Sequence, residues 1–131
     1  MMLKRTRRLL LAAVLLSAAA AAQAADWELL GTRTVERRTD RDEIKVKAKE
    51  GTFRAIKLRV RRRGIELKDL KVHFGNGDVH DVQVRRVIPA GGQTRVIDLP
   101  GGARVIEKVA FYYQTRSRGR QRAVVELWGL R

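Results

Sequence analysis

Hydrophobic and polar residues alternate along much of this chain. Residues 44–49 alternate strictly between apolar side chains and lysines, and residues 56–61 alternate between aliphatic side chains and cations. A period of two places the apolar side chains on one face of an extended strand and the cations on the other. A helix would scatter the same residues around its circumference. The pattern therefore predicts two half-buried strands.

The remaining segments predict further strands. We expect one or two strands in residues 27–37, interrupted at Gly31, and a strand in 65–74 with a bulge near Asp69, where the alternation changes phase. The other expected strands span residues 79–88, 95–99, 105–115 and 123–130. Glycine-rich turns separate these segments and contain both prolines of the chain, as a sheet requires. The spacing predicts an all-β fold, an antiparallel β-sandwich or jelly roll of about eight strands.

The two ends of the predicted domain resemble each other. Trp27-Glu28-Leu29-Leu30-Gly31 is similar to Val125-Glu126-Leu127-Trp128-Gly129. The similarity is either a coincidence between two strands that end in glycine or a sign that the terminal strands lie side by side. In the second case each strand contributes a tryptophan to the edge of the domain.

The N-terminal residues follow a different pattern. Four cations and no acid lie in the first eight residues, an apolar run follows from Leu9, and Ala22-Gln23-Ala24 fits the small-x-small rule for cleavage. We expect residues 1–24 to be a signal peptide, and residues 25–131 to be a single basic all-β domain that is exported to the periplasm or secreted. The alternative is an uncleaved anchor, although the apolar stretch is shorter than the roughly 20 residues that span a bilayer.

Charge and cysteine content narrow the possible functions. The chain has 29 Lys and Arg residues and 14 Asp and Glu residues, a formal net charge of +15. Four of these cations and none of the acids lie in residues 1–24, so the remaining domain carries +11. The chain has no cysteine, which excludes disulfides, zinc–thiolate sites, iron–sulfur clusters and thiol catalysis.

Several short motifs carry a resemblance to a known family. They are Ile97-Asp98-Leu99-Pro100-Gly101-Gly102-x-Arg104-Val105-Ile106, Val109-Ala110-Phe111-Tyr112-Tyr113 and Val125-Glu126-Leu127-Trp128-Gly129, with earlier pieces at residues 29–31, 53–58 and 72–77. Together they look like a family of small exported bacterial proteins described only as a domain of unknown function. The last two strands also resemble the closing strands of galactose-binding-like jelly-roll modules. The resemblance implies a β-sandwich and a binding role, but no activity. Such modules usually bind through apical loops with aromatic groups, whereas the loops here carry arginine and glycine.

Cations dominate the candidate binding residues. If the two alternating strands paired, their lysines and arginines would form a two-row basic field on one sheet face, and a second cluster surrounds Gly119 in an expected hairpin tip. Like charges directly opposite each other destabilise a sheet, which favours an anionic partner, and arginine suits phosphate and carboxylate. The alternative is a solvated face that only keeps the protein soluble. The predicted anion-binding residues are Lys45, Lys47, Lys57, Arg59, Arg61, Arg116, Arg118, Arg120 and Arg122.

Other kinds of site have less support. His73 and His80 flank a glycine-rich turn and could face each other in a hairpin, with Asp78 and Asp81 nearby, as in a metal site. The alternative is a routine tight turn between histidines on polar faces, and we expect no metal and no cofactor. The sequence contains neither a Gly-x-Ser-x-Gly elbow nor a phosphate-binding glycine loop. We therefore expect a protein that is not an enzyme.

The sequence leaves several functions open. We expect the exported β-sandwich to bind an anionic envelope surface, which could be lipopolysaccharide phosphates, acidic polysaccharide or anionic lipid headgroups. One alternative is a structural or assembly protein that pairs through an exposed strand edge. Another is extracellular nucleic-acid binding, which is disfavoured because aromatic residues do not interleave with the basic strands. We expect no transmembrane segment in the mature chain.

Overall fold

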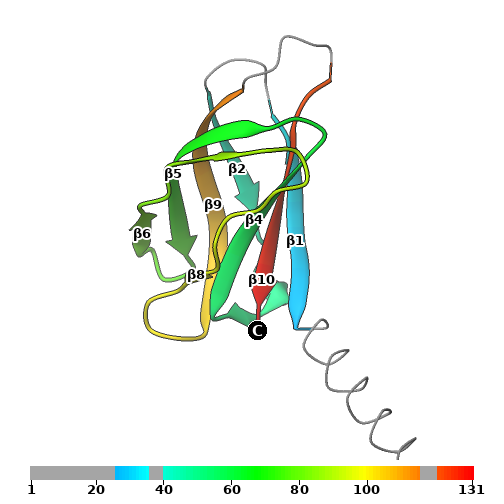
Figure 1. Ribbon diagram of the computed structural model, residues 1–131. Coiled ribbons are helices and arrows are strands. Elements are labelled where there is room, and N and C mark those ends of the chain that lie inside the picture. Colours follow the sequence, from blue (N-terminus) through cyan, green and yellow to red (C-terminus); the bar gives the residue numbers. More distant parts are fainter. Residues whose placement is uncertain (1–25, 36–39, 116–120) are drawn as a thin grey trace, which may run out of the picture.

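The computed structural model describes residues 26–35, 40–115 and 121–131. Within these residues ten strands form two antiparallel sheets, which face each other across the core (Figure 1). The four-stranded sheet has the order β1 (Trp27–Thr34), β10 (Val124–Leu130), β4 (Ala55–Arg61), β8 (Ile97–Asp98). In the six-stranded sheet the order is β2 (Asp40–Lys45), β9 (Arg104–Thr115), β5 (Ile65–Phe74), β6 (Val79–Val82), with β3 (Thr52–Phe53) beside β9 and β7 (Arg86–Ile88) beside β5. The predicted all-β sandwich is confirmed.

The core lies between the two sheets. Strand β4 shows how the alternation builds it, because Ile56, Leu58 and Val60 are fully buried while Arg59 and Arg61 are exposed. Aromatic side chains fill the largest volumes of this core, namely Phe53, Phe74, Phe111 and Tyr113. The burial of aliphatic and aromatic side chains is the main favourable contribution to folding in a chain without cysteine.

Two sequence predictions about strand geometry are confirmed. The pairing of β5 with β9 shifts register between Leu67 and Asp69, where the phase change predicted a bulge. Strand β1 also has an irregularity, between Leu29 and Gly31. The terminal strands β1 and β10 pair directly, so they lie side by side, as one of the two interpretations of their similarity predicted.

Strand β2 ends earlier than the alternation predicts. It stops at Lys45, and Ala48–Glu50 forms a short 3₁₀ helix, η1. The N–H groups of Glu50 and Gly51 donate to the carbonyls of Lys47 and Ala48, and Gly51 takes a φ of 87°. These turn hydrogen bonds replace the strand ladder and redirect the chain towards β3, so the prediction of a strand up to residue 49 is wrong.

Two other predicted strands differ from the structure in extent. The expected strand at residues 79–88 is two strands, β6 and β7, and the expected strand at 95–99 is reduced to Ile97–Asp98 in β8. The expected signal peptide, residues 1–24, lies outside the described residues. Among the residues that the structure describes, no helix has the length and apolar character needed to cross a membrane.

Candidate functional site: the tryptophan face

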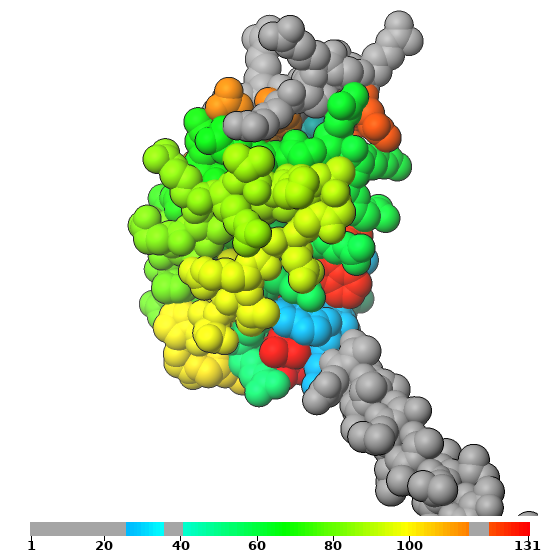
Figure 2. All heavy atoms as spheres, viewed as in Figure 1, coloured from blue at the N-terminus to red at the C-terminus, as the bar shows by residue number. Residues whose placement is uncertain are grey.

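The outer face of the four-stranded sheet carries three of the predicted anion-binding residues. Lys57, Arg59 and Arg61 alternate with the buried residues of β4 and therefore point away from the core. Strand β10 separates β4 from β1, and residues of all three strands reach the surface side by side (Figure 2). The order of the strands places this row of cations next to the two terminal strands.

The two tryptophans of the chain lie on this same face. Trp128 of β10 is opposite Lys57 on one side and Leu29 on the other, and residues opposite each other in a sheet share a face. Trp27 lies two residues before Leu29 in β1 and therefore on the same face. The Lys57 ammonium is 4.2 Å from the centre of the Trp27 ring, which is a cation–π contact. We call the outer-face residues Trp27, Leu29, Lys57, Arg59, Arg61, Glu126 and Trp128 the tryptophan face.

A buried carboxylate joins two members of the tryptophan face. The Glu126 side chain is only 8% exposed, and its Oε2 lies 3.3 Å from Nε of Arg61. Its Oε1 accepts a hydrogen bond of 3.3 Å from the Trp128 indole. Glu126 therefore helps to hold the Arg61 guanidinium and the Trp128 indole in place. The Arg61 side chain nevertheless remains 52% exposed.

Further cations extend the tryptophan face at one end. Arg59 is exposed and lies opposite Glu126, and Arg62 follows Arg61 in the turn after β4. Arg122 is also exposed and precedes β10 at the end where Val124 pairs with Arg61. Arg116, Arg118 and Arg120 lie outside the described residues. The only acids that the described pairings place on this outer face are Glu126 and Asp98, so positive charge dominates it.

Lys45 lies elsewhere, at the end of β2 in the six-stranded sheet, and Lys47 follows it immediately before η1. Strand β2 pairs with β9 and strand β4 pairs with β10 and β8, so the prediction of a two-row basic field is wrong. The chain crosses from one sheet to the other through η1 and β3 between these two strands. A hollow of about 420 Å³ forms where Lys45 meets Lys108 of β9. We call it the lysine hollow; its lining is Lys45, Val46, Lys47, Glu107 and Lys108.

Acids and cations interleave on the adjoining part of the six-stranded face. Arg41 lies 2.7 Å from Glu43, and Lys108 lies 3.5 Å from the other carboxylate oxygen of Glu43. Arg41 also donates a hydrogen bond of 3.2 Å to the hydroxyl of Tyr112. The hydrogen bond from Arg41 lowers the pKa of the Glu43 carboxyl. The charge of the Glu43 carboxylate is therefore balanced by the cations beside it.

The two histidines do not face each other, as they would in a metal site. Strands β5 and β6 make the expected hairpin, but His73 is opposite Val79 while His80 is opposite Val72. Because neighbouring positions of a strand point to opposite faces, the two imidazoles lie on different sides of the sheet. In the described part of the chain no group of three potential ligands could hold a metal ion.

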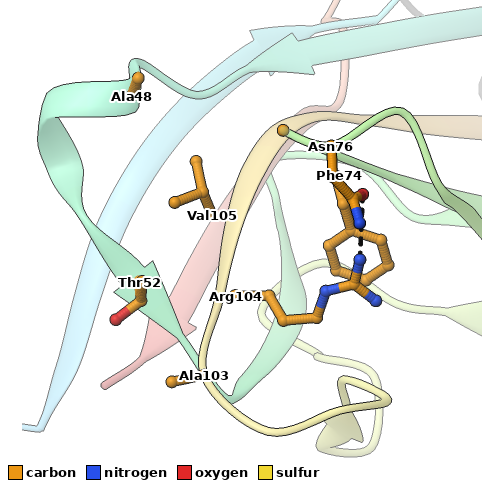
Figure 3. Close-up of a pocket in the computed structure, with 8 residues that line it drawn as sticks. Ala48, Thr52, Phe74, Asn76, Ala103, Arg104 and Val105 are labelled. Carbon is orange, nitrogen blue, oxygen red and sulfur yellow. Dashed lines mark hydrogen bonds between the residues drawn. The ribbon is translucent and has the colours of Figure 1, made fainter.

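Asp78 instead belongs to a junction around Arg104. The guanidinium of Arg104 lies 3.7 Å from the centre of the Phe74 ring and donates a bond of 3.0 Å to Asn76 Oδ1 (Figure 3). It donates another bond of 3.0 Å to Asp78 Oδ2. A third bond, of 3.3 Å, goes to the carbonyl of Pro100. An adjoining cleft of about 530 Å³ has mainly small or apolar side chains, including Ala48, Ala103 and Val105. Since Arg104 is engaged by three acceptors, this junction has a structural role that sequence analysis missed.

One carboxylate pair makes a testable contribution to pH dependence. Burial raises the pKa of Asp69, and a hydrogen bond with Asp81 raises it further. Between the pKa of Asp69 in the unfolded chain and its higher pKa in the folded protein, the folded protein holds a proton that the unfolded chain has released. The contribution of this proton to the free energy of unfolding therefore grows as the pH falls through that range. Hydrogen bonds from Asn76 and Arg104 have the opposite effect on Asp78, because they lower its pKa.

We expect Asp81→Asn to raise the unfolding temperature at pH 7, because it removes the repulsion from Asp69, and to lose this advantage as the pH falls and Asp69 becomes protonated. Asp78→Asn is the matched control, and it should lower the unfolding temperature at pH 7 with a difference that also shrinks in acid. Thermal unfolding followed by circular dichroism at pH 7 and pH 3 measures both. If both variants changed the unfolding temperature equally and independently of pH, the opposite effects assigned to Asp81 and Asp78 would be wrong.

Comparisons with known proteins agree with this architecture. A family model described as a domain of unknown function (DUF2541) matches residues 9–129. No curated protein matched the chain. Among solved structures, AlgX of Pseudomonas aeruginosa is similar with a TM-score of 0.54 and 11% identity, over 79% of this chain and 26% of that one. The chain thus spans about a quarter of the AlgX chain, and the likeness shows the fold alone.

Other similar structures are more distant. The prophage-derived protein YomS of SPBc2 has a TM-score of 0.43 at 13% identity, over 80% of this chain and 91% of that one. The C-terminal family 22 carbohydrate-binding module of Clostridium thermocellum Xyn10B has a TM-score of 0.30 at 9% identity, over 80% and 85%.

Proposed function

The chain belongs to the DUF2541 family, whose description assigns no activity, and we propose that it is a non-enzymatic module that binds an acidic polysaccharide through the tryptophan face. One observation carries the proposal, namely that Lys57 and Arg59 project beside two tryptophans on one sheet face. We place this function outside the cytoplasm, because residues 1–24 have the pattern of a signal peptide.

The chemistry of this face suits a sugar polymer with carboxylates. An indole ring offers a flat apolar surface to the C–H groups of a pyranose, while its N–H serves as a polar handle. Guanidinium and ammonium groups bind carboxylates through charge-assisted hydrogen bonds. An open sheet face also admits a polymer that extends beyond the protein at both ends, which an enclosed pocket would exclude.

The way in which the indoles are held favours a polymer over a bilayer. Trp27 and Trp128 are both half-buried, Trp27 under the ammonium of Lys57 and Trp128 by its bond to Glu126. Side chains held in this way provide a surface against which a ligand packs, rather than a wedge that inserts among acyl chains. The tryptophan face is therefore better suited to a sugar chain than to lipid headgroups.

Charge reversal on the tryptophan face tests the proposal. We expect the Lys57→Glu/Arg59→Glu variant to bind polygalacturonate oligomers more than about 100-fold more weakly than the wild type at low salt, because two charge-assisted contacts become repulsive. Isothermal titration calorimetry measures the dissociation constants. Arg85→Glu/Arg86→Glu makes the same charge change at two exposed positions, at and just before the start of β7 in the six-stranded sheet. It should leave binding within about twofold, because these residues are not part of the tryptophan face and exposed charges are screened by salt.

Two results would overturn the proposal. The first is equal binding by the wild type and Lys57→Glu/Arg59→Glu. The second is tighter binding of single-stranded DNA than of the oligomer at the same ionic strength, which would assign the cations and tryptophans to nucleic acid. A Trp27→Ala variant separates charge from packing, since it keeps every charge and should still weaken binding several-fold.

A further inference from the structure

We infer that the lysine hollow is a second anion-binding site, and that the protein thereby joins two acidic polysaccharide chains, one on each outer face of the sandwich. The binding of an anion in the hollow stands on its own geometry, whereas the joining of two chains also rests on the proposed function of the tryptophan face.

Strand pairing brings the lysines of the hollow together. Lys45 and Lys108 are direct partners in the β2–β9 pairing, on the outer face of the six-stranded sheet. Lys47 lies two residues beyond Lys45 and lines the same hollow. The N–H of Val46 donates a bond of 2.9 Å to the carbonyl of Glu107, which continues the β2–β9 pairing past the end of β2. The positions of the three lysines are therefore set by the backbone.

The ionic contacts of the hollow leave positive charge available. Lys108 is the lysine nearest an acid, at 3.5 Å from Glu43. Among the described residues, neither Lys45 nor Lys47 takes part in an ion pair, and both are exposed. Like charges directly opposite each other weaken a sheet, so an anion between Lys45 and Lys108 would relieve repulsion present in the free protein. Glu107 also lines the hollow, and its negative charge would repel a ligand with many closely spaced anionic groups. The hollow therefore suits a single anionic group.

The chemistry of lysine indicates the type of group that binds. An ammonium acts as a point charge with freely oriented donors, without the planar fork of arginine. A uronate carboxylate can accept hydrogen bonds from such donors in many orientations. The hollow therefore suits one carboxylate of a polymer, while the tryptophan face binds both the rings and the carboxylates of another chain.

The two sites lie on opposite sides of the molecule. Lys57 and Arg59 belong to the four-stranded sheet, whereas Lys45 and Lys108 belong to the six-stranded sheet, and the hydrophobic core separates the two sheets. Two polymer chains can therefore occupy both sites at once. A monomer with two such faces can cross-link acidic polysaccharide without forming an oligomer.

Stoichiometry and cross-linking test the inference together. We expect the wild type to bind two equivalents of a short polygalacturonate oligomer in calorimetry and to make a solution of long polygalacturonate turbid at intermediate protein concentrations. Lys45→Gln/Lys47→Gln should bind one equivalent with the affinity of the tryptophan face and lose at least nine-tenths of the turbidity. Arg85→Gln/Arg86→Gln removes the same charge and should behave as the wild type. Thermal unfolding of each variant checks that it folds.

The outcomes separate this inference from the proposed function. One equivalent in the wild type, lost in Lys57→Glu/Arg59→Glu, would refute the second site and leave the proposed function intact. Two equivalents that persist in Lys57→Glu/Arg59→Glu would instead refute the tryptophan face. Turbidity that survives Lys45→Gln/Lys47→Gln, together with sedimentation of the protein as a dimer, would show that the protein cross-links by self-association and would overturn the inference.

Discussion

We expect Gly129→Ala to lower the unfolding temperature by roughly 5–20 °C, since overpacking a well-filled core costs about 1–3 kcal/mol in a domain of this size. Gly129 lies on the inner side of β10, next to Trp128 in the chain. A Cβ atom at this position would lie 2.7 Å from Cδ1 of Phe53 and 2.8 Å from Cδ1 of Leu30. The Leu30 methyl can rotate away, but Phe53 is fully buried in the core and has little freedom to move.

A double-mutant cycle identifies the cause of the destabilisation. Phe53→Leu makes space at the position of the clash but leaves a cavity of its own. If the ring of Phe53 causes the effect of Gly129→Ala, the double variant should be more stable than the sum of the single effects by about 0.5–3 kcal/mol, as coupled neighbours are. Thermal unfolding followed by circular dichroism supplies the four values. Additive effects would show that the alanine is disfavoured for a reason other than contact with Phe53.

Gly129 connects the core to the candidate site. Because neighbouring residues of β10 point to opposite faces, the close approach of Phe53 beneath Gly129 helps fix the part of the strand that presents Trp128. We therefore expect a bulky residue at position 129 to disturb the tryptophan face as well as the core.

Local alternation was sufficient to predict much of the fold. Residues 56–61 alternate because one face of β4 meets the core, and that pattern placed Lys57, Arg59 and Arg61 on the outside without knowledge of the neighbouring strands. The bulge near Asp69 was visible for the same reason. Both features depend on residues within one strand, and a sequence records these directly.

Strand partners depend on residues far apart and were harder to predict. The strands that hold Lys45 and Lys57 look alike and follow each other in the chain, yet η1 and β3 carry the chain from one sheet to the other between them. Lys108 was missed because its position opposite Lys45 follows only from the register of β9. Glu126 was missed as well, because its burial depends on contacts with Arg61 and Trp128 that become visible only in the folded structure.

A second large loss of stability is expected from Tyr113→Phe, because a hydrogen bond to a charged group contributes about 1.5–3 kcal/mol. The ring of Tyr113 is fully buried in β9, and its hydroxyl donates a bond of 2.7 Å to Oδ2 of Asp42 in β2. The other oxygen of Asp42 lies 3.1 Å from Nε of Arg33, which belongs to β1 of the opposite sheet. The three side chains thus join the two sheets at one edge of the sandwich.

The neighbouring tyrosine provides a matched control for this prediction. Tyr112 is half-buried on the outer face, where its hydroxyl accepts a bond of 3.2 Å from exposed Arg41. Tyr112→Phe removes the same atom from the next position in the strand and should cost less than about 1 kcal/mol, because water can replace the lost contact. Urea denaturation of both variants measures the difference. Equal losses would mean that the bond between Tyr113 and Asp42 contributes no more than a surface contact, and that packing alone joins the two sheets at this edge.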